Sequence, residues 1–173
     1  MKVLCMAGIV LLSVMLETAV LPNMTILGVA PDFLLCIVVS FALLDGSLFG
    51  ALTGAAAGLL IDIACGSILG FYALQYVIVG YLAGIPYKRM QVGRFFLPPI
   101  MAAVLYAVKT ALLSILLFVT GSGVHIAAMW LYYVALGTLL TTILMLPVHL
   151  LNARLHMTRL FRTRKNRDVG AYF

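Results

Sequence analysis

Long apolar stretches separated by short breaks decide what this chain can fold into. A helix needs about 20 apolar residues to cross the hydrocarbon core of a bilayer. Of the 173 residues, 65% are hydrophobic and only 9% are charged, whereas a soluble domain has about a quarter of its residues charged. The sequence therefore predicts an all-α integral membrane protein, a bundle of about six transmembrane helices. The predicted spans are residues 3–21, 32–44, 47–64, 68–86, 97–120 and 126–151.

The basic residues predict the orientation of this bundle. Ten of the eleven Lys and Arg residues are Lys2, three residues of the 88–94 loop and six residues of the C-terminal segment. If six spans are correct, all ten lie on one side of the membrane, and the positive-inside rule places both termini in the cytoplasm. Residues 152–173 then form a basic cytoplasmic tail that could bind anionic lipid or an acidic cytoplasmic partner. Its basic residues are Arg154, Arg159, Arg162, Arg164, Lys165 and Arg167.

A row of glycines gives the third span a face without side chains. Gly50, Gly54 and Gly58, here called the glycine row, recur every four residues, so they follow one face of a helix. The fourth span has a similar pair, Gly80 and Gly84. Small residues at this spacing let transmembrane helices approach closely. Two interpretations stay open: the glycines pack spans two to four together, or part of the row docks a helix of another protein.

Three ionisable residues, Glu17, Asp62 and Lys109, fall within predicted spans. Each costs about 2.5–3.5 kcal/mol at a helix centre, so such residues usually face the bundle and find partners. We predict that Lys109 pairs with Asp62 or Glu17. In one alternative, both acids reach interfacial water and Lys109 binds backbone carbonyls. In another, the three residues form a proton or ion relay.

Sequence motifs of enzymes are not found. The chain has no H-E-x-x-H, no G-x-S-x-G, no phosphate-binding loop and no clustered Cys and His residues. We therefore predict a protein that is not an enzyme, with no catalytic residue, no cofactor and no metal site.

Four segments resemble a known family by their order and spacing: residues 31–35 (PDFLL), 54–62 (GAAAGLLID), 69–74 (LGFYAL) and 80–84 (GYLAG). The chain is similar to the rod shape-determining protein MreD, with Pro31, Asp32, Asp62 and Gly70 at the family's motif positions. The resemblance implies a multi-pass protein of the bacterial inner membrane that is a scaffold of the elongation complex. Its implied partners are MreC, the MreB filament, the polymerase RodA and a class B penicillin-binding protein. No nucleic acid is expected as a partner.

The resemblance also leaves an alternative function open. The family is similar in architecture to the substrate-binding subunits of energy-coupling-factor vitamin transporters. Such a subunit would have a small-molecule pocket among the outer helix ends near Asp62 and Glu17. Aromatic residues available to line it are Phe71, Tyr72, Trp130 and Tyr133.

Overall fold

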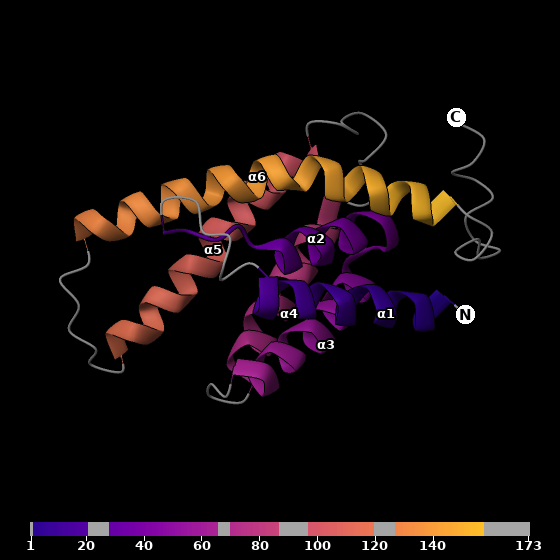
Figure 1. Ribbon diagram of the computed structural model, residues 1–173, viewed down its shortest axis with the longest axis horizontal. Coiled ribbons are helices and arrows are strands. Elements are labelled where there is room, and N and C mark those ends of the chain that lie inside the picture. Colours follow the sequence, from indigo (N-terminus) through magenta and orange to yellow (C-terminus); the bar gives the residue numbers. More distant parts are fainter. Residues whose placement is uncertain (1, 21–27, 66–69, 87–96, 120–126, 158–173) are drawn as a thin grey trace.

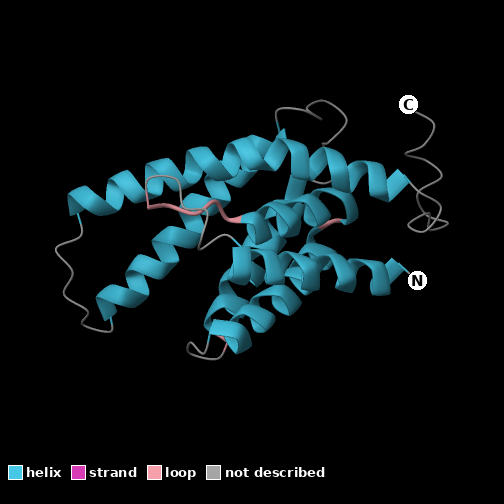
Figure 2. Cartoon of the chain, viewed as in Figure 1, coloured by secondary structure: helices cyan, strands magenta, loops and turns pink. Residues whose placement is uncertain are grey.

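The described part of the chain is a bundle of helices (Figures 1 and 2). This computed structural model describes residues 2–20, 28–65, 70–86, 97–119 and 127–157, and no β-strand occurs among them. The helices are α1 (Lys2–Met15), its π-helical continuation η1 (Leu16–Val20), α2 (Phe33–Asp45), α3 (Ser47–Cys65), α4 (Phe71–Gly84), α5 (Leu97–Val119) and α6 (Ala127–Met157).

Helix α2 is the centre of the bundle. Its sequence is apolar on every side, and a helix of this kind has no face that prefers water. From Leu34 to Leu43 every side chain is buried, and the helix packs against α1, α3, α4, α5 and α6. At about 1.5 Å per residue, α2 is too short to cross the hydrocarbon core. Its first turn begins inside the bundle, at the centre of Figure 1.

Helices α3 and α4 form a hairpin in which the two backbones touch. A Cβ atom built on Gly54 would collide with the backbone of Tyr76, and one on Gly58 would collide with the backbone of Ala73. Gly80 and Gly50 meet each other in the same way. The glycine row is therefore covered by α4 of the same chain, which is the first of the two interpretations above. This contact is the kind that small residues permit between membrane helices.

Helices α5 and α6 pair with each other, and the end of α5 and the start of α6 project past the other helices, away from the first residues of α1 (Figure 1). Buried Gly137 of α6 leaves room for the Tyr106 ring of α5. Helix α6 continues to Met157, beyond residue 151 where the predicted span ends. Its last turns include Arg154, a residue of the predicted basic tail, which is exposed on the helix.

Three of the helices are long and apolar enough to cross a membrane: the segments Ser47–Ala64, Leu97–Ile115 and Tyr132–Arg154. Three shorter apolar helical segments, Met6–Ala19, Phe33–Asp45 and Phe71–Gly84, complete the described bundle. The first residues of α1 and the last residues of α6 lie at the same end of the molecule (Figure 1).

Candidate functional site

The start of α2 is held by Asp32. The helix begins at Phe33, and Asp32 is its N-cap. One carboxylate oxygen, Oδ1, accepts a hydrogen bond of 2.8 Å from the Leu35 amide. The Asp32 amide donates to the Thr141 hydroxyl of α6 over 3.2 Å. Asp32 is only 5% exposed, so this cap lies inside the protein.

Glu17 satisfies the next amides of the same helix. The π-helical turn η1 carries this side chain to the start of α2, where its Oε2 accepts hydrogen bonds from the Phe33 amide at 3.0 Å and the Leu34 amide at 3.2 Å. The first amides of a helix have no partner within that helix. Inside a membrane protein water does not replace such partners freely, so carboxylates from two different segments supply them.

Lys109 of α5 forms an ion pair with the Oδ2 atom of Asp32. The Tyr76 hydroxyl lies between the two charges: it donates to Asp32 Oδ1 at 3.0 Å and accepts from Lys109 Nζ at 2.6 Å. The predicted pairing of Lys109 with Asp62 or Glu17 is therefore wrong. Sequence reasoning missed Asp32 as the partner of Lys109, because it named Asp32 only as a position of the family motif.

Asp62 lies at a different helix start. It is 1% exposed and accepts three backbone hydrogen bonds, from Gly70 at 2.9 Å, Tyr72 at 3.1 Å and Ala73 at 3.1 Å. These amides form the first turn of α4, whose N-cap Gly70 has a left-handed backbone (φ +95°). An Asp62 carboxylate occupied in this way is turned toward α4, which explains why it does not meet Lys109.

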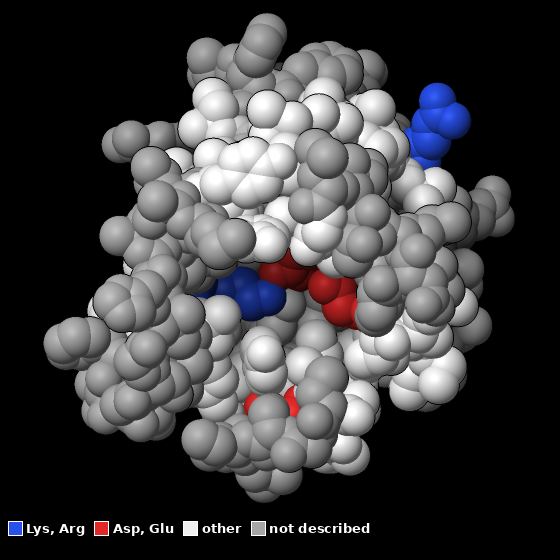
Figure 3. Space-filling view, turned by 60° about the vertical axis from the view of Figure 1, so that its left-hand side comes forward, with Lys and Arg blue, Asp and Glu red and all other residues white. Residues whose placement is uncertain are grey.

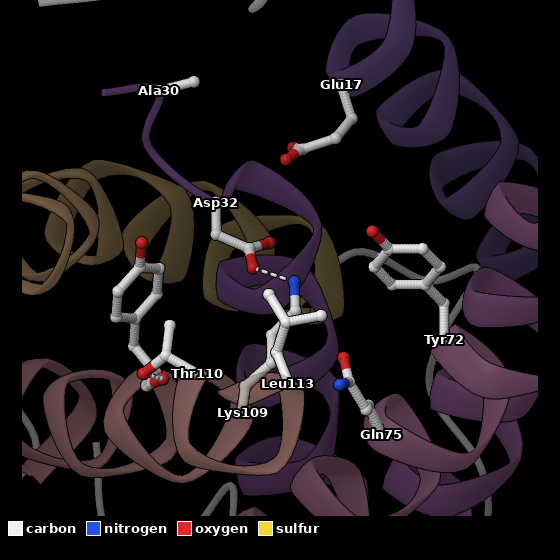
Figure 4. Close-up of a pocket in the computed structure, with 9 residues that line it drawn as sticks. Glu17, Ala30, Asp32, Tyr72, Gln75, Lys109, Thr110 and Leu113 are labelled. Carbon is white, nitrogen blue, oxygen red and sulfur yellow. Dashed lines mark hydrogen bonds and ion pairs between the residues drawn. The ribbon is translucent and has the colours of Figure 1, made fainter. Parts of the chain in front are cut away.

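A cavity of about 190 Å³, lined by both charged and apolar groups, opens beside the Asp32–Lys109 pair. Figure 3 shows acidic and basic side chains side by side at the bottom of this hollow. The residues that line it include Glu17, Asp32, Tyr72, Gln75, Tyr106 and Lys109. In Figure 4 the side chains of Glu17 from η1 and of Tyr72 and Gln75 from α4 converge around the ion pair.

Gln75 stands out among these lining residues. It is 2% exposed, and neither its Nε2 nor its Oε1 atom has a hydrogen-bond partner among the described residues. Buried polar groups are nearly always paired, and an unpaired one costs about 1–3 kcal/mol. Its sequence position gave no signal, because one glutamine in an apolar helix is unremarkable until the cavity beside it is known.

The pocket predicted near Asp62 and Glu17 is only partly in the right place. Glu17 and Tyr72 do line the cavity, but Asp62, Phe71 and Tyr133 are not among its lining residues. The side chain of Trp130 lies outside the described residues, as do Arg159, Arg162, Arg164, Lys165 and Arg167 of the basic tail.

The family model of the rod shape-determining protein MreD matches residues 1–155, from the start of the chain into the last turns of α6. The chain belongs to the MreD family. Searches of curated proteins and of solved structures gave no match. Family membership gives this MreD-family protein a role in determining rod shape, and the apolar helices described above agree with a membrane protein.

The two acids in the segments that resemble MreD, Asp32 and Asp62, both cap the start of a helix. Asp32 follows Pro31 at the start of α2, and Asp62 caps α4 from the end of α3, next to Gly70. Of the ionisable groups at the cavity, Asp32 and Lys109 balance each other as an ion pair, and Glu17 lies beside them at the positive end of the α2 dipole. The charged and polar side chains that line the cavity are suited to binding a polar group.

Proposed function

We propose that this MreD-family protein is a non-enzymatic scaffold of the bacterial elongation complex that binds MreC and helps position peptidoglycan synthesis. The observation that carries the proposal is the family match over residues 1–155. MreB, RodA and a class B penicillin-binding protein are further proposed partners, reached directly or through MreC.

The construction of the hairpin supports a scaffold. Backbone contact along the glycine row, together with Asp62 on the first turn of α4, joins α3 and α4 without flexible side chains between them. The opposite side of α3 is apolar and exposed at Leu48, Leu52 and Ile63. Such a surface can face lipid or the transmembrane helix of a partner.

We propose an inner-membrane location with both termini in the cytoplasm. The distribution of ten basic residues supports this orientation, as does the common location of the α1 start and the α6 end. A single cysteine added after Phe173 should react with a membrane-impermeant thiol reagent only after the cells are opened. Labelling in intact spheroplasts would contradict the orientation.

Co-purification tests the scaffold function. When the protein and MreC are produced together and extracted in mild detergent, we expect MreC to be retained by the tagged chain through size-exclusion chromatography. An unrelated single-span protein with the same tag serves as the control. The proposal would be contradicted if the tagged chain retained no more MreC than the control protein does.

The cavity beside the Asp32–Lys109 pair favours a second candidate, the substrate-binding subunit of a vitamin-type transporter. That function requires the chain to bind a solute and to support its uptake with an energising module. Uptake that depends on the chain, in cells lacking their own transporter for the solute, would favour this candidate. Rod shape restored without any effect on uptake would favour the scaffold.

A further inference from the structure

The cavity beside the Asp32–Lys109 pair contains a recognition group that the bundle itself does not use. Asp32, Tyr76 and Lys109 satisfy one another, and Glu17 Oε2 binds two amides of α2. Gln75 is different, because its whole amide group is buried without a described partner. Figure 4 shows this amide directed toward the space enclosed by the lining residues.

The chemistry of Gln75 restricts what can fill that space. A primary amide presents a donor and an acceptor side by side. The group that satisfies both at once is another amide edge, with its own adjacent N–H and C=O. The rings of Tyr72 and Tyr106 line the same cavity, so a flat group attached to that edge has apolar surface to lie against.

The charges around the cavity select against anions. Among the described lining residues Lys109 is the one cation, and it already pairs with Asp32. A carboxylate entering the cavity would lose its hydration and find no free positive charge there, which is costly for a buried charge. A neutral donor-bearing group can instead approach the Glu17 side.

We propose that this cavity is a binding site for a neutral carboxamide group, with Gln75 as its hydrogen-bonding partner. Its volume of about 190 Å³ sets the size at roughly that of a substituted aromatic amide. The group has two sources, a free small molecule or an Asn or Gln side chain of a partner's transmembrane helix. The inference goes beyond the scaffold function, and it rests on that function only where the partner is the source.

The first arm of the test uses free ligands of the same shape. Benzamide, acetophenone and benzoate are titrated against the purified protein in nanodiscs, and binding is followed by saturation-transfer NMR. We expect benzamide to bind about tenfold more tightly than acetophenone, because loss of one neutral hydrogen bond has about this effect. Benzoate should not bind measurably.

Variants then assign the binding to Gln75. Gln75→Leu keeps the approximate volume and removes the amide, so benzamide should bind it no better than acetophenone binds the original protein. Thr53→Val is the matched control, because the Thr53 hydroxyl bonds to Phe49 and Gly50 of its own helix and lies outside the cavity. A thermal melt shows whether each variant is folded.

The second arm tests the partner as the source. If benzamide does not bind, Gln75→Leu should weaken the co-purification of MreC, whereas Thr53→Val should not. The proposal is overturned if benzamide and acetophenone bind equally well, or if Gln75→Leu leaves benzamide binding unchanged. It is also overturned if benzamide fails to bind and MreC retention is absent or the same in both variants. Failure of MreC to bind the unaltered chain, with benzamide still bound, would contradict only the scaffold function.

Discussion

The starts of helices α2 and α4 are both capped by a buried carboxylate, and the two starts are completed in different ways. At α4 a single carboxylate, Asp62, accepts hydrogen bonds from three backbone amides at the start of the helix, and this residue is 1% exposed. At α2 two carboxylates share the amides, and a lysine, a tyrosine and a cavity lie next to them. The free amides of the α4 start are thus satisfied by one acid, whereas the α2 start combines two acids with a lysine, a tyrosine and a cavity.

The difference separates structural polar groups from groups that are available for binding. Capping α4 needs one acid, so the further charges at the start of α2 exceed what a helix cap requires. A buried ion pair is weak evidence for stability, because apolar residues of similar volume often serve as well. We therefore regard the α4 start as part of the framework and the α2 start as the candidate site.

The largest loss of stability should come from Lys109→Met, which tests the start of α2. This change leaves Asp32 as an uncompensated buried charge, and breaking a buried pair in this way costs about 3–5 kcal/mol. The free energy of unfolding can be followed by titration with SDS. Adding Asp32→Asn should recover at least about 1 kcal/mol, since the unpaired charge is then gone.

A matched double-mutant cycle combines Lys109→Met with a change at the start of α4. Lys109→Met and Asp62→Asn should be additive within about 0.5 kcal/mol, because the hydrogen bonds described above join the two side chains to different residues. A stronger coupling of Lys109 to Asp62 than to Asp32 would reverse the comparison between the two starts.

A somewhat smaller loss is expected from Gly54→Leu, which tests the framework. The new side chain would have to occupy the position of the Tyr76 backbone, and overpacking of this kind costs about 1–3 kcal/mol. Ala56→Leu is the control on the same helix, because Ala56 is exposed and should change stability by less than about 0.5 kcal/mol. Equal yields and equal SDS midpoints for the two variants would disprove close packing of α3 on α4.

Asp62→Asn should destabilise the protein by about 1–2 kcal/mol, because the amide side chain replaces a charged acceptor that serves three amides. The effect should be local. Hydrogen exchange at the Tyr72 and Ala73 amides is expected to accelerate, whereas Asp32→Asn should leave these two amides unchanged. Protection lost equally at the starts of α2 and α4 would show that the two are not independent.

The smallest effect should follow Glu17→Gln. The carbonyl oxygen of glutamine can still accept from the Phe33 and Leu34 amides, so we expect a loss of about 0.5–1 kcal/mol. Thr18→Val next to it is the control, because the Thr18 hydroxyl bonds to Val14 of its own helix. A loss as large as that of Lys109→Met would mean that Glu17, too, is required by the ion pair.

The sequence predicted the helical class and the order of the helices, because apolar length and the glycine spacing are local signals. Gly50, Gly54 and Gly58 could be identified as a packing face from their spacing alone, although their partner could not. The predicted partner of Lys109 was wrong for a related reason. Spacing along the chain places an acid near a helix end, but only the packing of α2 in the middle of the bundle shows that Asp32 lies deep enough to meet α5.

The cavity could not be predicted at all from local patterns. Gln75 and Glu17 are 58 residues apart in the sequence numbering, and they become neighbours only when the bundle forms. Pro31 and Asp32 did carry a signal through the MreD resemblance, but it indicated the family and not the ion pair. Side chains that meet across several helices have no periodicity that a sequence can display.

The central position of α2 also has a consequence for biosynthesis. Asp32 needs Lys109 and Thr141, and Ser40 meets His149 over 3.2 Å, yet all three partners are synthesised much later than α2. While the ribosome makes the intervening chain, the start of α2 has its acids but no cation. We expect nascent chains that end before α5 to remain sensitive to membrane proteases, and resistance to appear only after α6 has been inserted.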